Sequence, residues 1–238
     1  MGDVTDPTAP GNVWRTADRW PPPSQPLRLY FTPGGGLDPQ PPATPTTREY
    51  DYDPLRPVPS IVVDWVPGDG PSGGPRDQRR VENWPDVLLF TTPPLAEPLE
   101  VTGPITVHLV AMTSALDTDF TARLTDVYPD GRSMLVTAGI IRGSYRNSLE
   151  KADFLTPGQR YDFDIDVGAT SLIFNKGHRL RVAISSSNSP RFEANQNNGK
   201  SWPNDQNYPS VVAHQTIFLG GVDGSSIVLP QVLGTTGP

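Results

Sequence analysis

The strongest constraint on the fold is a regular alternation of apolar and polar residues that recurs along the chain. It is clearest in YDFDIDV (161–167), where apolar residues alternate with Asp162, Asp164 and Asp166. A period of two puts alternate side chains on opposite faces of a β-strand, so that one face is apolar and the other faces water. The same pattern predicts strands at residues 27–31, 87–90, 105–111, 119–124, 133–141, 161–167, 179–185, 216–219 and 226–229.

Helical periodicity is nearly absent from the sequence. No amphipathic helix of three turns is found, and only SLEKADF (148–154) offers about one turn. About ten half-buried strands joined by long loops predict an all-β fold. We expect a two-sheet sandwich with jelly-roll topology, similar to a galactose-binding domain. A sandwich can reach 238 residues as a single unit, so we expect one domain over residues 1–238.

The stretch DTDFTARLTDVYPDGRSMLVTAGIIRG (117–143) is expected to form a β-hairpin. Its centre, Pro129-Asp130-Gly131, supplies a preset φ, a side chain that bonds the local backbone, and a residue that tolerates positive φ. In the first strand the alternation slips at Asp126, which predicts a bulge or the end of the strand. In the second strand it predicts a core-facing set consisting of Met134, Val136, Ala138 and Ile140.

Three aspartates of this hairpin, Asp117, Asp119 and Asp126, raise the question of a site. Aspartates at a junction between a loop and a strand commonly accept backbone N–H bonds. We therefore expect them to fix loop ends and hairpin geometry, and we predict no metal and no cofactor. The alternative is a calcium site at Asp117 and Asp119, which would need further carboxylate or carbonyl ligands.

Charge and composition exclude several classes of function. The net charge of −7 and pI of about 4.9 argue against binding to nucleic acid or to an anionic membrane surface. The absence of cysteine excludes disulfides, thiolate metal sites and cysteine nucleophiles, and it leaves the compartment open. No apolar run is long enough to span a membrane, and the first residues do not read as a signal peptide, which slightly favours the cytoplasm.

No catalytic constellation is recognisable in this sequence. The G-x-S-x-G motif of α/β-hydrolases is absent, and the three histidines lack metal-ligand spacing. His108 lies in a predicted strand with its side chain pointing outward, His178 in a turn, and His214 before a predicted strand. We expect all three to be structural and predict no catalytic residue. A self-sufficient enzyme with an unrecognised site is the alternative.

Two loops are candidates for binding. The polar stretch SSSNSPRFEANQNNGKSWPND (185–205) resembles loops of sugar-binding sandwiches, so a carbohydrate-binding module that uses Trp202 is an alternative function. The interpretation we favour is a long connection whose amide side chains satisfy their own backbone. Trp65 opens a Gly/Pro-rich loop, and exposed aromatic residues on such loops indicate docking onto a partner.

A set of ordered segments also resembles a known family. They occur in the same order as in the C-terminal domain of the cocaine esterase-like family, which groups cocaine esterase, α-amino acid ester hydrolases, glutaryl-cephalosporanic acid acylases and X-Pro dipeptidyl-peptidases. The most specific are DTDFTARLTDVYPDGR and GHRLRVAISSSNSP. The others are VWRTADRWPPP, YDYDPLRPVPS, PRDQR, EVTGPITVHL, GIIRGSYR, PGQRYDFDID and SSIVLP.

The resemblance implies a non-catalytic jelly roll that accompanies an α/β-hydrolase domain with a Ser-Asp-His triad and a helical cap. It also implies that Met1-Gly2 continues a strand leading into the domain. The expected partners are that catalytic domain, in the same chain or another, and a small acyl ester or amide substrate; homo-oligomerisation is a further expectation. By order of motifs, Trp65 and Val66 are expected at the rim of the substrate pocket.

Overall fold

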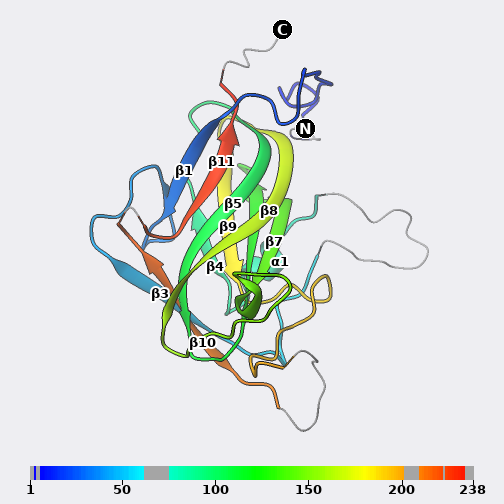
Figure 1. Ribbon diagram of the computed structural model, residues 1–238. Coiled ribbons are helices and arrows are strands. Elements are labelled where there is room, and N and C mark those ends of the chain that lie inside the picture. Colours follow the sequence, from blue (N-terminus) through cyan, green and yellow to red (C-terminus); the bar gives the residue numbers. More distant parts are fainter. Residues whose placement is uncertain (1–2, 4–5, 62–74, 201–208, 222, 234–238) are drawn as a thin grey trace, which may run out of the picture.

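The computed structural model describes residues 3, 6–61, 75–200, 209–221 and 223–233 (Figure 1). These residues form mainly strands, with one short α-helix, α1 (Arg79–Glu82), and one 3-10 turn, η1 (Gly143–Tyr145). No helix in the described part of the chain is long and apolar enough to cross a membrane. The strands are β1 (Gln25–Phe31), β2 (Leu37–Asp38), β3 (Thr46–Tyr52), β4 (Leu88–Thr91), β5 (Leu99–Thr113), β6 (Asp119–Val127), β7 (Ser133–Arg142), β8 (Arg160–Phe174), β9 (Arg179–Ser185), β10 (Ala213–Leu219) and β11 (Ser226–Gln231).

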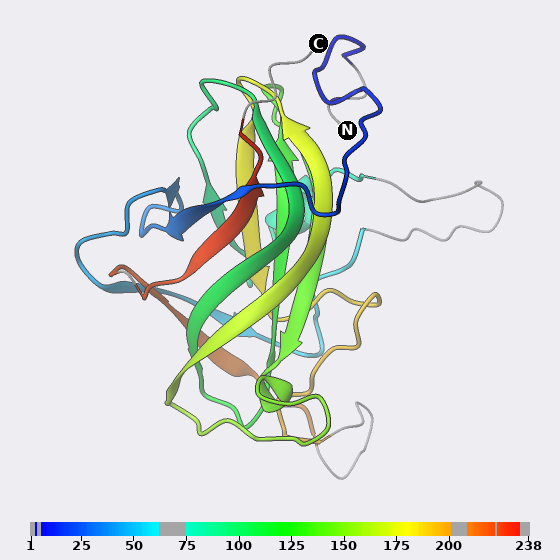
Figure 2. The same cartoon turned by 45° about the horizontal axis from the view of Figure 1, so that its top comes forward.

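The strands form two antiparallel sheets, which confirms the predicted jelly-roll sandwich. One sheet has the order β2-β1-β11-β5-β10-β3, with β8 on the other edge of β5, and the second has the order β4-β9-β6-β7. Figure 1 and Figure 2 show the long, strongly twisted pair β5–β8 in front of the second sheet. Along its other edge, β5 pairs with β11 and then with β10. This strand therefore spans the sandwich from one end to the other.

The core lies between the two sheets. Phe120, Ala122 and Leu124 of β6 are buried there, and they meet the inward residues of β8, as the Phe120–Phe163 ring distance of 4.9 Å shows. Ile165 and Val167 are buried as well, whereas Asp162, Asp164 and Asp166 are exposed. The predicted alternation of β8 is therefore confirmed. Full burial of each such side chain contributes about 1.5–3 kcal/mol.

The predicted hairpin of β6 and β7 is present and contains a bulge. Phe120 pairs with Ile141 and Leu124 with Thr137, but Thr125 pairs with Leu135, so the register shifts by one residue. Between this bulge and the C-terminal end of β7, the predicted core-facing set is wrong. Directly paired residues share a face, so Ile141 joins Phe120 on the core side, and Ala138 and Ile140 lie on the opposite face.

The turn of the hairpin has the predicted chemistry. Gly131 has a φ of +90°, and its N–H donates to the carbonyl of Tyr128. The carboxylate of Asp130 accepts bonds from the backbone N–H and the side chain of Arg132. This turn therefore fixes the two strands through short-range bonds.

One local prediction is wrong, and two short elements lack a sequence signal. The one-turn helix expected at 148–154 is a loop, in which Asp153 accepts bonds from Arg146 and Asn147. An isolated helical turn is unstable, because nucleation must fix several residues while few hydrogen bonds form. β3 and α1 were not predicted. Both carry charged residues in their short spans, and their structure comes from pairing or packing with distant segments.

Candidate functional site

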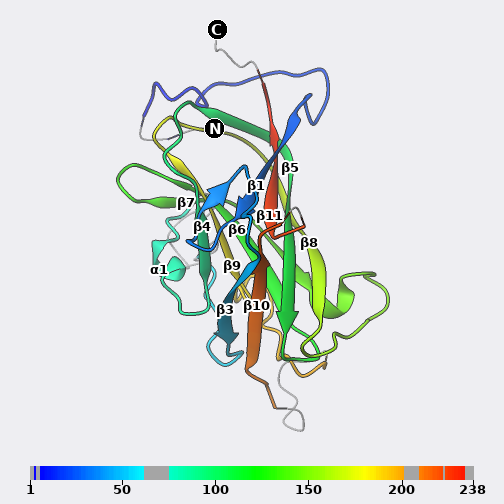
Figure 3. The same ribbon diagram turned by 90° about the vertical axis from the view of Figure 1, so that its left-hand side faces the viewer.

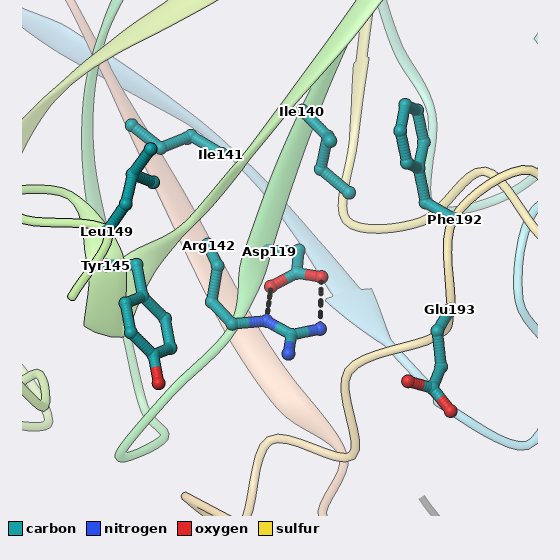
Figure 4. A pocket seen from close by; sticks show the side chains of 8 residues that line it. All are labelled: Asp119, Ile140, Ile141, Arg142, Tyr145, Leu149, Phe192 and Glu193. Atoms are coloured by element: carbon teal, nitrogen blue, oxygen red, sulfur yellow. Dashed lines mark hydrogen bonds and ion pairs between the residues drawn. The ribbon is translucent and has the colours of Figure 1, made fainter. Parts of the chain in front are cut away.

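Two of the hairpin carboxylates, Asp117 and Asp119, lie together at one end of the sandwich and are hydrogen-bonded there. Asp119 Oδ1 and Oδ2 accept bonds from Arg142 Nε at 2.9 Å and Nη2 at 3.1 Å (Figure 4). Asp117 accepts bonds from the backbone N–H of Ser144 at 2.8 Å and from its hydroxyl at 3.0 Å. The Asn195 amide donates to both carboxylates, at 3.1 and 2.8 Å. They therefore join β6, β7, η1 and the 186–212 loop, as expected for structural acids.

The electrostatics of this cluster favour an ion pair between Asp119 and Arg142. Burial raises the pKa of Asp119, and the Arg142 guanidinium and the Asn195 amide oppose that shift. The hydrogen bond to Asp119 raises the pKa of Arg142. We infer that the pair is ionised at neutral pH, because the bidentate geometry supplies two charge-assisted bonds. The described residues include no group of three or more acidic or histidine side chains that could hold a metal ion.

The same ion pair lines a pocket of about 390 Å³. Figure 4 shows side chains from β6, β7, η1 and two loops around it. Its lining is mainly apolar and aromatic, with Asp119, Arg142 and Glu193 as the charged groups. The lining residues are Asp119, Ile140, Ile141, Arg142, Tyr145, Leu149, Phe192 and Glu193. A pocket of this composition suits an apolar group with one polar end.

Exposed apolar side chains continue around this pocket. Arg142 and Tyr145 also line a small adjoining hollow that contains Phe154, and Phe154 and Leu116 both approach Gly199. We call the pocket and these side chains the loop-end face. Its exposed apolar members are Leu116, Leu149 and Phe154, with Leu149 at 90% exposure. A contiguous apolar surface of this kind is typical of a contact with a partner.

The predicted rim residues Trp65 and Val66 lie outside the described residues, as does Trp202. The residues that lead to the rim segment are nevertheless placed. Ser60 N–H donates to the carbonyl of Ser189 at 2.6 Å, and Ser189 belongs to the loop that contributes Phe192 and Glu193 to the pocket. The chain therefore enters the predicted rim segment from a position bonded to the pocket loop.

The histidines take structural positions. His108 points outward from β5 and bonds Asp164 of β8 at 2.9 Å. His178 is buried and bonds Asp126 at 2.9 Å, which joins the start of β9 to β6 near the hairpin turn. His214 bonds Asp51 at 2.7 Å. Within the described part of the chain each histidine thus bonds a carboxylate, and none bonds a hydroxyl that could serve as a nucleophile.

Several described amide side chains of the polar loop bond its own backbone or that of the residues beside it, as the favoured interpretation expected. The Asn197 side chain donates to the carbonyl of Val211, and Asn198 donates to that of Pro209. Asn195 accepts a bond from the backbone N–H of Asn197. These amides hold the loop in place, so the described part of this loop gives no support to a carbohydrate site.

Comparison with known proteins identifies the family. Residues 3–228 match the family described as the X-Pro dipeptidyl-peptidase C-terminal non-catalytic domain. The chain belongs to this family. This non-catalytic domain is similar to cocaine esterase of Rhodococcus sp. (strain MB1 Bresler), with 37% identity over 229 residues, which covers 92% of the chain and 40% of that esterase. A putative serine esterase of Mycobacterium bovis is 29% identical over 208 residues, or 76% of the chain and 32% of the esterase.

Solved structures agree with this assignment. An aminopeptidase from the marine sediment archaeon Thaumarchaeota archaeon matches with a TM-score of 0.85 and 29% identity, covering 93% of the chain and 39% of the aminopeptidase. An α-amino acid ester hydrolase matches with a TM-score of 0.78 and 33% identity, covering 87% and 36%. The non-catalytic domain thus spans less than half of each of these relatives, and in each it accompanies a longer remainder of chain.

Sequence reasoning missed most residues of the pocket. Ile140 was assigned to the core because the bulge was not placed, and Leu149 was assigned to a helical turn. Arg142 and Tyr145 come from one segment and Phe192 and Glu193 from another, and the two segments meet only in the folded chain. The motifs GIIRGSYR and SSSNSPRFEAN contain many of these residues, and they are the sequence signal that could have indicated the pocket.

Proposed function

We propose that this chain is the non-catalytic domain of a serine hydrolase, either one that acts on acyl esters or amides or one of the X-Pro dipeptidyl-peptidase type. In this role it packs on the α/β-hydrolase domain and shapes the substrate pocket. The observation that carries this proposal is the match of residues 3–228 to a non-catalytic domain, in a chain that spans 40% of cocaine esterase. A sandwich without a nucleophile–base pair in its described residues supports an assisting role.

The loop-end face is the proposed docking surface. It combines an apolar pocket with exposed apolar residues, and the loop that lines its pocket is bonded to the residue before the rim segment. The occupant we propose is the catalytic domain of the parent hydrolase. Trp65 and Val66 remain the proposed substrate-facing residues, and the acyl group of a small ester or amide is the proposed contact.

The test is reconstitution from separate polypeptides. The chain alone should not hydrolyse p-nitrophenyl butyrate. Mixed with the separately produced catalytic polypeptide of the parent protein, it should form a complex by size-exclusion chromatography and restore or stabilise esterase activity. Lack of any complex, or an acyl-enzyme on a serine of the 238-residue chain, would contradict the proposal.

A further inference from the structure

The outer face of the four-stranded sheet is covered by two chain segments. We call residues 54–61 and 75–87 the covering segments; α1 belongs to the second and lies beside β4 and β7 (Figure 3). Val58, Val81 and Val87 form a buried apolar cluster with Ala183 of β9. As a consequence all nine residues of β6 are buried, although only one face of the strand meets the main core.

Arg123 lies in the middle of this covered face. Its neighbours Ala122 and Leu124 face the core, so Arg123 lies on the opposite face of β6. Across the sheet it pairs with Ala183 of β9, and Ala183 pairs with Leu89 of β4. It is 1% exposed, and its one described bond runs from Nη2 to Ser185 Oγ at 3.4 Å. This bond directs the guanidinium from β6 toward β9, the strand that lies between β6 and β4. Nε and Nη1 have no hydrogen-bond partner among the described groups.

Asp86 lies just before β4 and is 4% exposed. Neither of its carboxylate oxygens has a hydrogen-bond partner among the described groups, and the same holds for both polar atoms of the buried Asn188 side chain. Burial raises the pKa of Asp86 to about 6, and Arg123 opposes that shift. Asp86 also lines a pocket of about 240 Å³ with Trp84 and Arg56.

The other charged groups nearby are already engaged. Glu82 accepts bonds from Ser133 Oγ at 2.5 Å and Arg181 Nη1 at 2.6 Å, and Arg56 pairs with Asp53 at 3.2 Å. The titratable and charged groups that act on Asp86 and Arg123 are Glu82, Asp53, Arg56, Tyr50 and Tyr52. Opposite buried charges with open hydrogen-bonding capacity and no direct contact are commonly joined by ordered water.

We propose that Arg123 and Asp86 are linked by buried water into a clamp that positions the covering segments and the adjoining pocket loop. Arg123 reaches Ser185, which precedes that loop, and Asp86 belongs to the second covering segment. Ser187 and Ser189 of the same loop bond Val58 and Ser60 of the first segment. The clamp is a property of this chain, whereas its effect on a substrate rests on the proposed function.

The first test measures the pKa of the Asp86 carboxyl by NMR in the 238-residue chain. Replacing Arg123 by Met should raise that pKa by about one pH unit, because the facing cation is lost. Arg132→Met, at the exposed hairpin turn, is the matched control and should leave it unchanged. If Arg123→Met does not fold, Asp86→Asn should instead speed solvent exchange of the Arg123 Nε–H severalfold. An unchanged Asp86 pKa, or unchanged Arg123 exchange, would overturn the clamp.

The second test uses the assembled hydrolase of the reconstitution experiment. Asp86→Asn should raise KM for a bulky acyl ester severalfold with kcat unchanged, because a displaced rim weakens binding in ground and transition states alike. If the wild-type chain restores activity and Asp86→Asn behaves identically, the positioning role is wrong. If the wild-type chain restores no activity, the proposed function fails, and the NMR result on the clamp is unaffected.

Discussion

At the scale of single residues, buried charges decide the geometry of both ends of the hairpin. Asp119 and Arg142 join β6 to β7 beside the pocket, and Asp126 and His178 join β6 to the start of β9 near the turn. Each pair buries polar groups that bond each other, so removal of one partner leaves the other without that bond. Substitutions at these positions therefore act by leaving a buried group unpaired.

Asp119→Ala should destabilise the chain by about 2–4 kcal/mol. Breaking a buried ion pair costs roughly 3–5 kcal/mol, and partial exposure of Arg142 reduces that cost. Chemical denaturation measures the change. Asp162→Ala, on the exposed face of β8, is the control and should stay within about 0.5 kcal/mol. In a reconstituted hydrolase, a variant of Asp119 that kept its stability but lost all turnover would contradict the structural role.

His214 should make stability depend on pH. Its hydrogen bond to Asp51 of β3, with a second contact to Glu49, raises its pKa above the ordinary value. A raised folded-state pKa stabilises the fold below the unfolded pKa, and this contribution is lost as pH rises through the folded pKa. His214→Gln should therefore lower Tm slightly at pH 5.5 and leave it unchanged at pH 9. Thermal scans at both values test this, and an equal decrease at both would contradict it.

At the scale of secondary-structure elements, the close approach of β7 to β8 closes the sandwich along one side. Thr137 donates its hydroxyl to the carbonyl of Val167 at 2.5 Å. Gly139 permits this approach, because a Cβ added there would lie 1.9 Å from the carbonyl oxygen of Asp166. The bulge in β8, where Ile105 pairs with Gly168 and Thr106 with Asp166, turns that backbone toward β7.

Gly139→Ala should destabilise the chain by about 2–3 kcal/mol, since the backbone of β8 or β7 must move to admit the methyl group. Gly34→Ala is the matched control, because a Cβ at Gly34 meets no atom within 4 Å. Denaturation midpoints of the two variants give the comparison. If Gly139→Ala were as stable as Gly34→Ala, the close approach of the two sheets would be incorrect.

At the scale of the whole molecule, the two ends of the sandwich differ. One end carries the chain before β1, where Arg15 bonds Glu100 at the start of β5 (Figure 1). The other carries the loop-end face, where Leu116 follows the end of β5. The proposed docking of the catalytic domain therefore concerns one end and leaves the other free.

Leu149→Asp should weaken binding of the parent's catalytic polypeptide about tenfold or more without lowering Tm. Leu149 is 90% exposed, so the folded chain loses little, and an apolar contact at the interface centre contributes at least about 1.4 kcal/mol. Val13→Asp, also exposed but near the opposite end, should bind as wild type does. Calorimetry of the three proteins tests this, and equal affinities would show that another surface docks.

The sequence alone determined most of the strands, the sandwich and the hairpin turn. Alternation and turn chemistry are local signals that survive in any arrangement of the strands. Only the tertiary structure decided the register of β7, the pairing of β3 and the assembly of the pocket from Arg142, Leu149 and Phe192. It also decided the burial of Arg123, because covering segments distant in sequence bury the face that alternation assigned to water. Such contacts depend on which distant segments meet, and a periodic pattern does not encode that choice.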